Sequence, residues 1–194
     1  MLREEFGKSP FRVADAIKAG ASRTTLHRLV HNGELEAPAR AVLQLRGGGL
    51  GMTSELAIVS VKAHHATICL NSALSFWDLT DELPASTHIA VARGTSLPQI
   101  ARPRTKVHVF NADTFDLGRE AATTDAHEPF WIYSPERSIV DALRMSRWIG
   151  RDVGLHALRR YLTRPGANPS ELSDISRLIG GERTLAPAME AILS

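Results

Sequence analysis

The stretch GASRTTLHRLVHNGELEAPARAVLQLRGGG, residues 20–49, decides the fold of the N-terminal part of the chain. Within it, SRTTLHRLVH has the pattern of an amphipathic helix, with Ser22 as its N-cap and Asn32-Gly33 as its end. The apolar side of this helix consists of Leu26, Leu29 and Val30. Its other side is polar and basic, so it is either an ordinary solvated surface or a surface suited to the major groove of DNA.

A shorter helix is expected before this one. It is predicted to start at Ser9-Pro10, because serine can cap a helix and proline fits its first turn. Its apolar stripe is predicted to consist of Phe11, Ala14, Ala16 and Ile17. Gly20 is expected to end it in a left-handed conformation that favours glycine. After the second helix, residues 34–47 predict a short β-hairpin with Pro38 near its tip.

The two helices have the features of a helix-turn-helix: a small residue where they cross, a glycine in the turn, and apolar anchors on the second helix. These features are supplied in order by Ala16, Gly20, Leu26 and Leu29. With the hairpin as a wing, the pattern predicts a winged helix-turn-helix whose second helix lies in the major groove. The residues predicted to contact DNA are Ser22, Arg23, Thr24, Thr25, His27, Arg28 and His31 on the helix, and Arg40 and Arg46 on the hairpin.

The predicted contacts differ in kind. Arg23 and Arg28 can each donate two hydrogen bonds to a guanine, worth about 1–3 kcal/mol of discrimination. Thr24 suits a thymine methyl or a base edge, and Thr25 with the N–H groups at the helix start suits a phosphate. Residues 1–46 contain eight Lys/Arg and five Asp/Glu, a net charge of +3, whereas the remainder carries −1. This basic excess in a short segment favours a nucleic-acid partner.

The length of the chain and a glycine-rich stretch within it predict two domains. Its 194 residues suffice for a small domain and a medium-sized one. The glycine-rich stretch RGGGLG predicts a boundary, so we expect a DNA-binding domain over 1–46, a linker over 47–51 and a second domain over 52–194. The single cysteine, Cys69, and the absence of a signal peptide or long apolar run predict a cytoplasmic protein.

The second domain has a mixed pattern of strands and helices, which gives an α+β protein overall, with a C-terminal helical cluster. Strands are predicted over residues 66–70, 87–93, 106–110 and 129–134. Helices are predicted over 53–65, 71–79, 134–150, 153–162, 169–179 and 184–193. Asn71 or Ser72 is expected to cap the second of these helices, Ser134 the third and Ser170 the fifth.

Charged clusters in the second domain are candidates for function. Three carboxylates gather between residues 78 and 82, and three arginines lie near one helix. Each group is either functional or a solvated surface, and together they form the predicted antitoxicity surface: Asp78, Asp81, Glu82, Arg151, Arg159 and Arg160. Asp141 sits among apolar residues at helical spacing, so it must be paired if buried, with Arg137 or with Arg144.

No catalytic, metal or cofactor site is expected from the remaining patterns. His27 and His31 have the i, i+4 spacing of metal ligands but lack a third ligand nearby. The glycine-rich stretch lacks the Lys-Ser/Thr of a phosphate-binding loop, and no nucleophile lies at readable spacing from a base. The sequence therefore predicts a protein that is not an enzyme and carries no cofactor.

The chain resembles the AbiEi-type antitoxins, which regulate bacterial type IV toxin–antitoxin pairs. The stretches that carry the resemblance are VADAIKAGASRTTLHRLVHNGELEAPARAVLQL, NSALSFWDLTDELPASTHIAVARG, SPERSIVDALR and VGLHALRRYL, in the family's order. The chain departs from the family at the wing, where Ala41-Val42 replaces the usual glycine and aromatic residue. The segment before the first helix is also short, so the usual supporting helix is expected to be reduced or to be supplied by residues 1–7.

The resemblance implies a repressor that binds inverted repeats at its own promoter, as a homodimer or as two copies that meet on operator DNA. It also implies that residues 52–194 counter a nucleotidyltransferase-like toxin without a stable complex, and it implies no membrane partner. Two alternatives remain open: a ligand-responsive repressor with a C-terminal sensor, and an enzyme that uses the carboxylates Asp78, Asp81 and Glu82.

Overall fold

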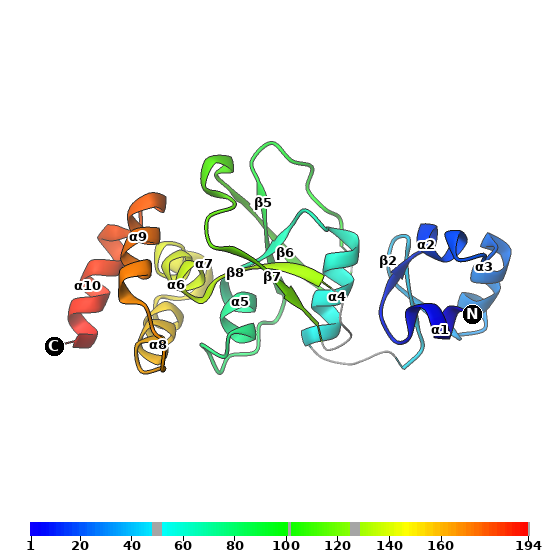
Figure 1. The fold of residues 1–194 in the computed structure, drawn as a ribbon, viewed down its shortest axis with the longest axis horizontal. Helices are drawn as coiled ribbons and strands as arrows, with labels where there is room; N and C mark the ends of the chain where they lie inside the picture. The colour runs from blue at the N-terminus through cyan, green and yellow to red at the C-terminus, as the bar shows by residue number, and fades with distance from the viewer. Residues whose placement is uncertain (48–51, 101, 125–128, 194) are drawn as a thin grey trace. The chain divides into compact units, whose positions relative to one another are not determined.

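The computed structural model describes residues 1–47, 52–100, 102–124 and 129–193 (Figure 1). In these ranges the chain is a mixed α+β protein, with ten α-helices and two β-sheets. Its contacts divide it into two compact units. One comprises Met1–Ala66, Ser96–Thr105 and Ala121–Trp131, and the other Thr67–Thr95, Lys106–Glu120 and Ile132–Ser194.

The first unit begins with three short helices and a small sheet. The helices are α1 (Leu2–Phe6), α2 (Val13–Lys18) and α3 (Arg23–His31), and the strands are β1 (Phe11–Arg12), β2 (Leu35–Ala39) and β3 (Val42–Leu45). The sheet is antiparallel with the order β1-β3-β2. Its core consists of Phe11, Ala16, Ala21, Leu26, Leu35 and Leu43. The short supporting helix expected in residues 1–7 is therefore present as α1, which packs on this core through Leu2 and Phe6.

The predicted start of the first helix at Ser9-Pro10 is wrong. Phe11 and Arg12 form a strand instead, because Phe11 pairs with Leu43 of β3 and stacks on Phe6 at 4.3 Å. Helix α2 therefore begins only at Val13, without a side-chain cap. The predicted apolar stripe is only half correct: Phe11 and Ala16 are buried, whereas Ala14 is exposed and Ile17 is 37% exposed.

The turn between α2 and α3 and the start of α3 agree with the prediction. Gly20 has a φ of +99°, a conformation that favours glycine, and the Ala21 N–H donates to the carbonyl of Ala16 at 2.9 Å. Ser22 caps α3 by accepting a hydrogen bond from the Thr25 N–H at 3.0 Å. Ala16 is fully buried where the turn folds back. The close approach of the two helices therefore rests on residues that the sequence singles out.

The predicted hairpin is present as β2 and β3, joined at Arg40-Ala41. Pro38 lies in an irregular part of the ladder between Glu36 and Ala39, where its missing N–H costs no regular hydrogen bond. Ala41 has a φ of +62°, which is the left-handed region. This is the position where the resemblance leads one to expect glycine.

Replacing Ala41 with glycine is expected to raise the free energy of unfolding by about 0.5–1 kcal/mol. A left-handed residue with a Cβ costs about 1–2 kcal/mol, and the greater backbone freedom of glycine in the unfolded chain offsets part of the gain. Urea unfolding measures the difference. The matched control is Ala37→Gly, an exposed position of β2 without a positive φ, which should be destabilised. Equal effects of the two changes would contradict the role given to Ala41.

Helix α4 (Met52–Lys62) packs on the hairpin. Ile58 and Val61 contact Ala39 and Val42. The Nε of Arg12 donates to the carbonyl of Val61 at 2.8 Å, which links β1 to α4 as well. The first compact unit therefore extends past residue 46. The predicted division into 1–46 and 52–194 remains a prediction, and most of the predicted linker, residues 48–51, lies outside the described residues.

The second sheet has the strand order β6-β5-β4-β8-β7. Its strands are β4 (Thr67–Ile68), β5 (Thr87–Ala92), β6 (Thr105–Phe110), β7 (Arg119–Thr123) and β8 (Pro129–Tyr133). Strand β4 pairs antiparallel with β5 and parallel with β8, where Ile68 faces Ile132. Four of the five strands match predicted ones. Strand β7 was not predicted, because its sequence REAAT has no large apolar residue and it lies at the sheet edge.

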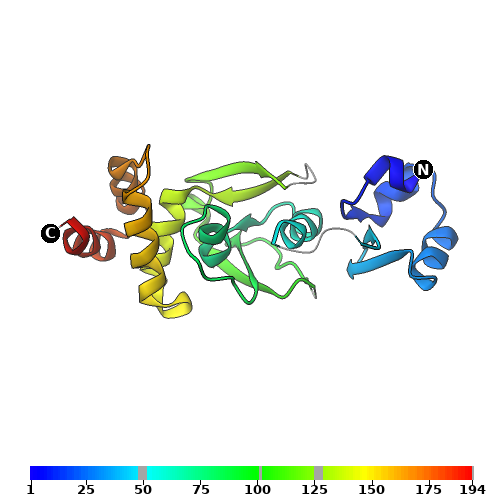
Figure 2. The same cartoon turned by 90° about the horizontal axis from the view of Figure 1, so that it is seen from below.

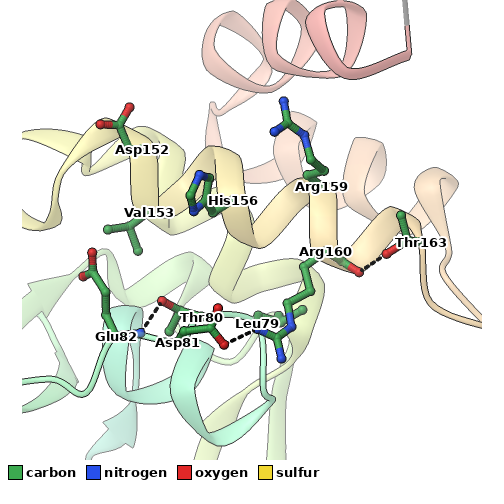
Figure 3. Close-up of a pocket in the computed structure, with 10 residues that line it drawn as sticks. All are labelled: Leu79, Thr80, Asp81, Glu82, Asp152, Val153, His156, Arg159, Arg160 and Thr163. Atoms are coloured by element: carbon green, nitrogen blue, oxygen red, sulfur yellow. Dashed lines mark hydrogen bonds and ion pairs between the residues drawn. The ribbon is translucent and has the colours of Figure 1, made fainter.

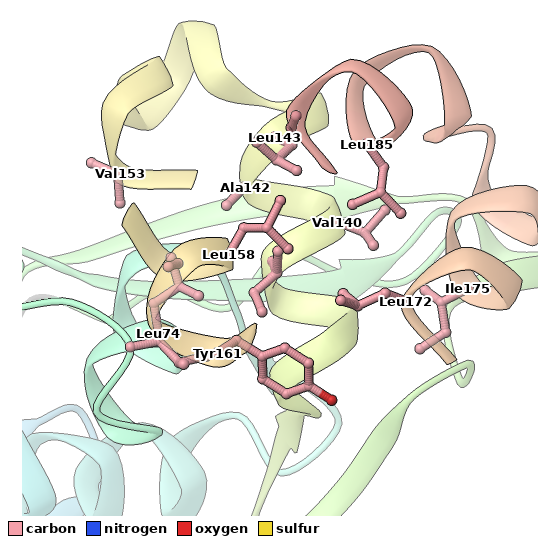
Figure 4. Close-up of a cluster of buried hydrophobic side chains, with 14 of the residues drawn as sticks. Leu74, Val140, Ala142, Leu143, Val153, Leu158, Tyr161, Leu172, Ile175 and Leu185 are labelled. Atoms are coloured by element: carbon pink, nitrogen blue, oxygen red, sulfur yellow. The ribbon is translucent and has the colours of Figure 1, made fainter. Parts of the chain in front are cut away.

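The second unit is completed by six helices: α5 (Leu70–Phe76), α6 (Pro135–Arg144), α7 (Ser146–Ile149), α8 (Arg151–Leu162), α9 (Pro169–Ile179) and α10 (Glu182–Leu193). The helices after residue 134, coloured yellow to red, gather in one cluster (Figures 1 and 2). Apolar side chains from α5, α6, α8, α9 and α10 meet around Val140 and Leu158, as Figure 4 shows. A Cβ on Gly154 would lie 3.0 Å from Leu143, so glycine permits the close crossing of α6 and α8.

Two of the predicted caps are wrong and one is confirmed. Helix α5 starts one residue earlier than predicted, and Ser72 instead accepts a hydrogen bond from the His88 N–H at 2.8 Å. Helix α9 is capped by Asn168, whose side chain accepts from the Glu171 N–H, so Ser170 is not the cap. Ser134 caps α6 as expected, accepting from the Arg137 N–H at 3.2 Å.

None of the helices in the described ranges combines the length and apolar character needed to cross a membrane.

Candidate functional site

The polar side of α3 is exposed as predicted. Ser22, Arg23, Thr24, His27, Arg28 and His31 are all exposed, and Thr25 is half-buried. Neither Arg23 nor Arg28 has an ion-pair partner in the part of the chain that the structure describes. The Thr25 hydroxyl and N–H both bond to Ser22, at 2.8 and 3.0 Å. The Thr25 N–H is therefore already used by the cap, and the two unpaired arginines are the donors available to a partner.

The exposed residues of α3 fall into two stripes. Arg23 and His27 flank an apolar hollow of about 210 Å³ that is also lined by Val13, Leu26, Val30 and Leu43. Thr24, Arg28 and His31 follow one another at i, i+4 and i+7, so they lie on one side of the helix. This second stripe faces away from the hollow. Arg28 is therefore the arginine of α3 that does not border the hollow.

The two arginines of the hairpin lie at its opposite ends. Arg40 is at the turn, and its carbonyl accepts a hydrogen bond from Lys62 of α4 at 2.9 Å. Arg46 follows β3, its N–H donates to the carbonyl of Glu34 at 3.0 Å, and its guanidinium lies beside Gly33 just after α3. Both side chains are exposed. The structure thus keeps Arg46 next to the end of α3, whereas Arg40 lies at the far end of the hairpin.

A charged cleft of about 630 Å³ lies in the second unit (Figure 3). Its lining comes from the loop after α5 and from α8: Leu79, Thr80, Asp81, Glu82, Asp152, Val153, His156, Arg159, Arg160 and Thr163. Of the six residues of the predicted antitoxicity surface, four line the cleft, and a fifth, Asp78, contacts Arg160 beside it. Arg151 is exposed at the start of α8 and does not line the cleft. Asp152 and His156 were not singled out by the sequence.

Arg160 joins the two sides of this cleft. It donates to Asp81 at 2.6 Å and to Asp78 at 2.8 Å, as Figure 3 shows for Asp81. Arg164 adds a second contact to Asp78 at 3.3 Å. The hydrogen bond to Asp81 and the nearby carboxylates raise the pKa of Arg160. Asp78 and Asp81 are thus paired with arginines. Such pairs are more typical of a surface of alternating charge than of a residue that transfers protons in catalysis.

A buried ion pair lies at the centre of the second unit. Asp141 is fully buried and accepts hydrogen bonds from Arg137 at 2.7 Å and from Arg144 at 3.0 Å, so both predicted partners are present. Burial raises the pKa of Asp141 above its usual value, and the two guanidinium groups offset only part of this rise. Arg137 also donates to the carbonyls of Thr114 and Leu117. This arrangement holds α6 to the segment before β7, so it is structural.

Two histidines form a pair that the sequence did not indicate. His88 of β5 and His108 of β6 stack, and Nδ1 of His88 lies 3.2 Å from Nε2 of His108. Burial, His108 and Lys106 lower the pKa of His88 to about 4. Burial and Lys106 also lower the pKa of His108. Both imidazoles are therefore neutral at pH 7.

Stability is expected to fall as the pH drops from 7 to 5, by about 1–2 kcal/mol from His88 alone. The unfolded histidine takes up a proton near pH 6.5, whereas the folded one does so only near 4. The unfolded chain therefore binds more protons in this range, and the stabilisation is complete only above about pH 6.5. Urea unfolding at both pH values measures it. His88→Phe should flatten the dependence, and His156→Gln, at an exposed position, should not.

In the described residues, no group of three His, Cys, Asp or Glu side chains is placed to hold a metal ion.

Comparison with known proteins identifies the N-terminal segment. Residues 1–42 match the family described as transcriptional regulator, AbiEi antitoxin. This part of the chain is therefore similar to antitoxin transcriptional regulators, as the sequence resemblance predicts. No curated protein matches the chain. The crystal structure of RV2827C protein from Mycobacterium tuberculosis is similar in fold, with 17% identity and a TM-score of 0.52 over 95% of this chain and 76% of that chain.

Proposed function

We propose that this chain is an antitoxin of a type IV toxin–antitoxin pair that represses its own operon. The observation that carries the proposal is the exposed side of α3, with two unpaired arginines, within a segment that matches antitoxin transcriptional regulators. The residues before and after it complete a winged helix-turn-helix: α2 crosses α3 at the buried Ala16, and the hairpin of β2 and β3 is the wing.

In this proposal α3 enters the major groove of operator DNA. Arg28 and Thr24 reach base edges, because they lie on the exposed stripe that faces away from the apolar hollow. Arg46, next to the end of α3, and Arg40, at the wing tip, contact the backbone or the adjacent minor groove. Two copies on an inverted repeat, as a dimer or as a pair that meets on DNA, place both recognition helices on one side of the duplex.

The first experiment compares binding of the full-length protein to its own upstream DNA and to scrambled DNA at two salt concentrations. The proposal predicts tight, sequence-dependent binding to the upstream DNA, with a loss of affinity at higher salt from the phosphate contacts. Equal, weak and salt-sensitive binding to both would leave only non-specific attraction. In that case the exposed side of α3 would be an ordinary solvated surface.

We further propose that the second unit neutralises a nucleotidyltransferase-like toxin, through the charged cleft between the loop at Asp81 and α8. The cleft presents carboxylates and arginines side by side. This arrangement favours a protein partner whose surface carries the complementary pattern of charges. The proposed activity is not enzymatic, because Asp78 and Asp81 are engaged by Arg160. The proposed place of action is the cytoplasm, where operator and toxin are both accessible.

Rescue of growth during toxin expression tests this surface. Reversing the charge on its exposed members, as Glu82→Lys with Arg159→Glu, should reduce rescue while the full-length protein remains folded and bound to its promoter. The matched control reverses two exposed charges on another helix, as Arg177→Glu with Asp174→Arg, and should rescue fully. Full rescue by the cleft variant would move the antitoxicity surface elsewhere in the second unit.

A further inference from the structure

A second hollow, of about 580 Å³, lies at the edge of the five-stranded sheet and is not part of the charged cleft. Strand β6 is the edge strand, and the hollow lies between it and α7. Its lining consists of His88, Lys106, Val107, His108, Val109, Met145, Arg147 and Trp148. The volume is within the range of about 300–1,000 Å³ that small-molecule sites occupy.

The charge of this hollow is purely positive. Lys106 and Arg147 line it, both are exposed, and no carboxylate is among the described residues of the lining. The two histidines add no charge at pH 7, because the pKa of each is lowered. The positive charge of Lys106 contributes to lowering the pKa of both histidines, so Lys106 lies near both rings. An anionic group is the ligand that such a lining favours.

The hollow also presents an aromatic surface. Trp148 is 59% exposed, although tryptophan side chains are highly buried on average. Its ring meets the edge of His108 at 6.4 Å, and the guanidinium of Arg147 lies 5.9 Å from its centre. An exposed tryptophan ring beside an arginine is the kind of platform on which nucleic-acid bases stack.

The histidine pair supplies hydrogen-bonding groups of both kinds. Because both rings are neutral, one of them donates its N–H to the other across the 3.2 Å contact. In either arrangement the pair keeps one further N–H donor and one further nitrogen acceptor.

We propose that the hollow between β6 and α7 binds a nucleotide, free or within a single strand of nucleic acid, with its base on Trp148 and its phosphate on Lys106 and Arg147. The combination of a base-stacking ring, two cations and neutral imidazoles fits this class better than a simple anion, which needs no exposed ring, or an apolar ligand, which needs no cations. The site does not depend on operator binding by α3.

The test measures binding of full-length protein to AMP, to UMP, and to a fluorescently labelled, single-stranded RNA of eight nucleotides. Calorimetry serves for the mononucleotides and fluorescence anisotropy for the strand. Trp148→Ala should weaken binding by about tenfold or more, as loss of a stacking platform does, and so should the pair Lys106→Gln with Arg147→Gln. All three residues are exposed, so these changes should leave the fold intact, which circular dichroism checks.

Two controls locate the binding. Arg183→Gln and Arg177→Gln each remove an exposed cation elsewhere in the second unit; both variants should bind the probes within about twofold of the unaltered protein. Binding of AMP or UMP supports a mononucleotide site, and binding of the strand alone supports a strand site. The proposal is overturned if none of the probes binds at concentrations up to about 1 mM, or if the Trp148 variant and the double variant bind as tightly as the unaltered protein.

Discussion

Replacing Arg28 with alanine is expected to weaken binding to the promoter by about tenfold or more. A bidentate contact between arginine and guanine is worth about 1–3 kcal/mol, and about 1.4 kcal/mol corresponds to a factor of ten. Arg28 is exposed, is on the stripe facing away from the apolar hollow, and has no ion-pair partner in the described part of the chain. Its removal therefore takes away a proposed DNA contact without disturbing the core. Titration of promoter DNA in an anisotropy or mobility-shift assay measures the loss.

Scrambled DNA distinguishes a base contact from a phosphate contact in the same experiment. If Arg28 reads a base, the ratio of promoter to scrambled affinity falls. If it binds only a phosphate, both affinities fall together and the salt slope drops by about one. The matched control is Arg3→Ala, which removes one exposed positive charge from α1 and should change both affinities little. If the variant bound the promoter as tightly as the unaltered protein, Arg28 would not contact DNA in the major groove. The variant should still protect cells from the toxin, because the proposed antitoxicity surface belongs to the second unit.

The parts of the N-terminal segment that depend on local interactions could be predicted from sequence. The cap at Ser22, the glycine turn at Gly20 and the length of α3 each follow from residues within a few positions of one another. The start of α2 could not, because Phe11 pairs with Leu43, far along the chain. A cap signal at Ser9-Pro10 is a local preference, and pairing with a distant strand overrides it.

The charged cleft shows how much a site owes to packing between distant segments. The sequence predicts one surface that contains the acidic cluster and the arginines near α8, but no local pattern shows that they lie side by side. Asp81 and Arg160, separated by 79 positions, come together because α5 and α8 both pack against α6. Asp152 and His156 complete the lining from α8 and carry no signal of their own.

The two histidines of the pair each lie inside a stretch of sequence that predicts a strand. His88 lies inside THIAVAR and His108 inside KVHVF, both predicted as strands. A polar ring in the interior of each of two strands is a reason to ask whether the strands are neighbours. Their adjacency, β6 next to β5, depends on the topology of the sheet, and no local pattern provides it.

Replacing Asp141 with alanine is expected to lower the free energy of unfolding of the second unit by about 3–5 kcal/mol. The change removes the carboxylate and leaves the guanidinium of Arg137, which is only 1% exposed, as a buried charge without its counterion. The hydrogen bonds that Arg137 donates to the carbonyls of Thr114 and Leu117 hold it in place, so it cannot turn toward water. Arg144, which is a third exposed, can do so and contributes less to the loss. Urea unfolding followed by circular dichroism and tryptophan fluorescence measures the change.

The chain contains its own control for this prediction. Asp174 pairs with Arg177 on α9 at 3.3 Å, also an Asp–Arg pair on one helix, but both side chains are mostly exposed. Asp174→Ala should therefore cost no more than about 0.5 kcal/mol, because solvent already screens the pair. The pair Arg137→Met with Asp141→Leu should cost less than Asp141→Ala alone, since it leaves no buried charge uncompensated. If Asp141→Ala were as mild as Asp174→Ala, the buried pair would not hold α6 in place. If the double variant were the more costly of the two, the hydrogen bonds from Arg137 to the carbonyls would matter more than its charge.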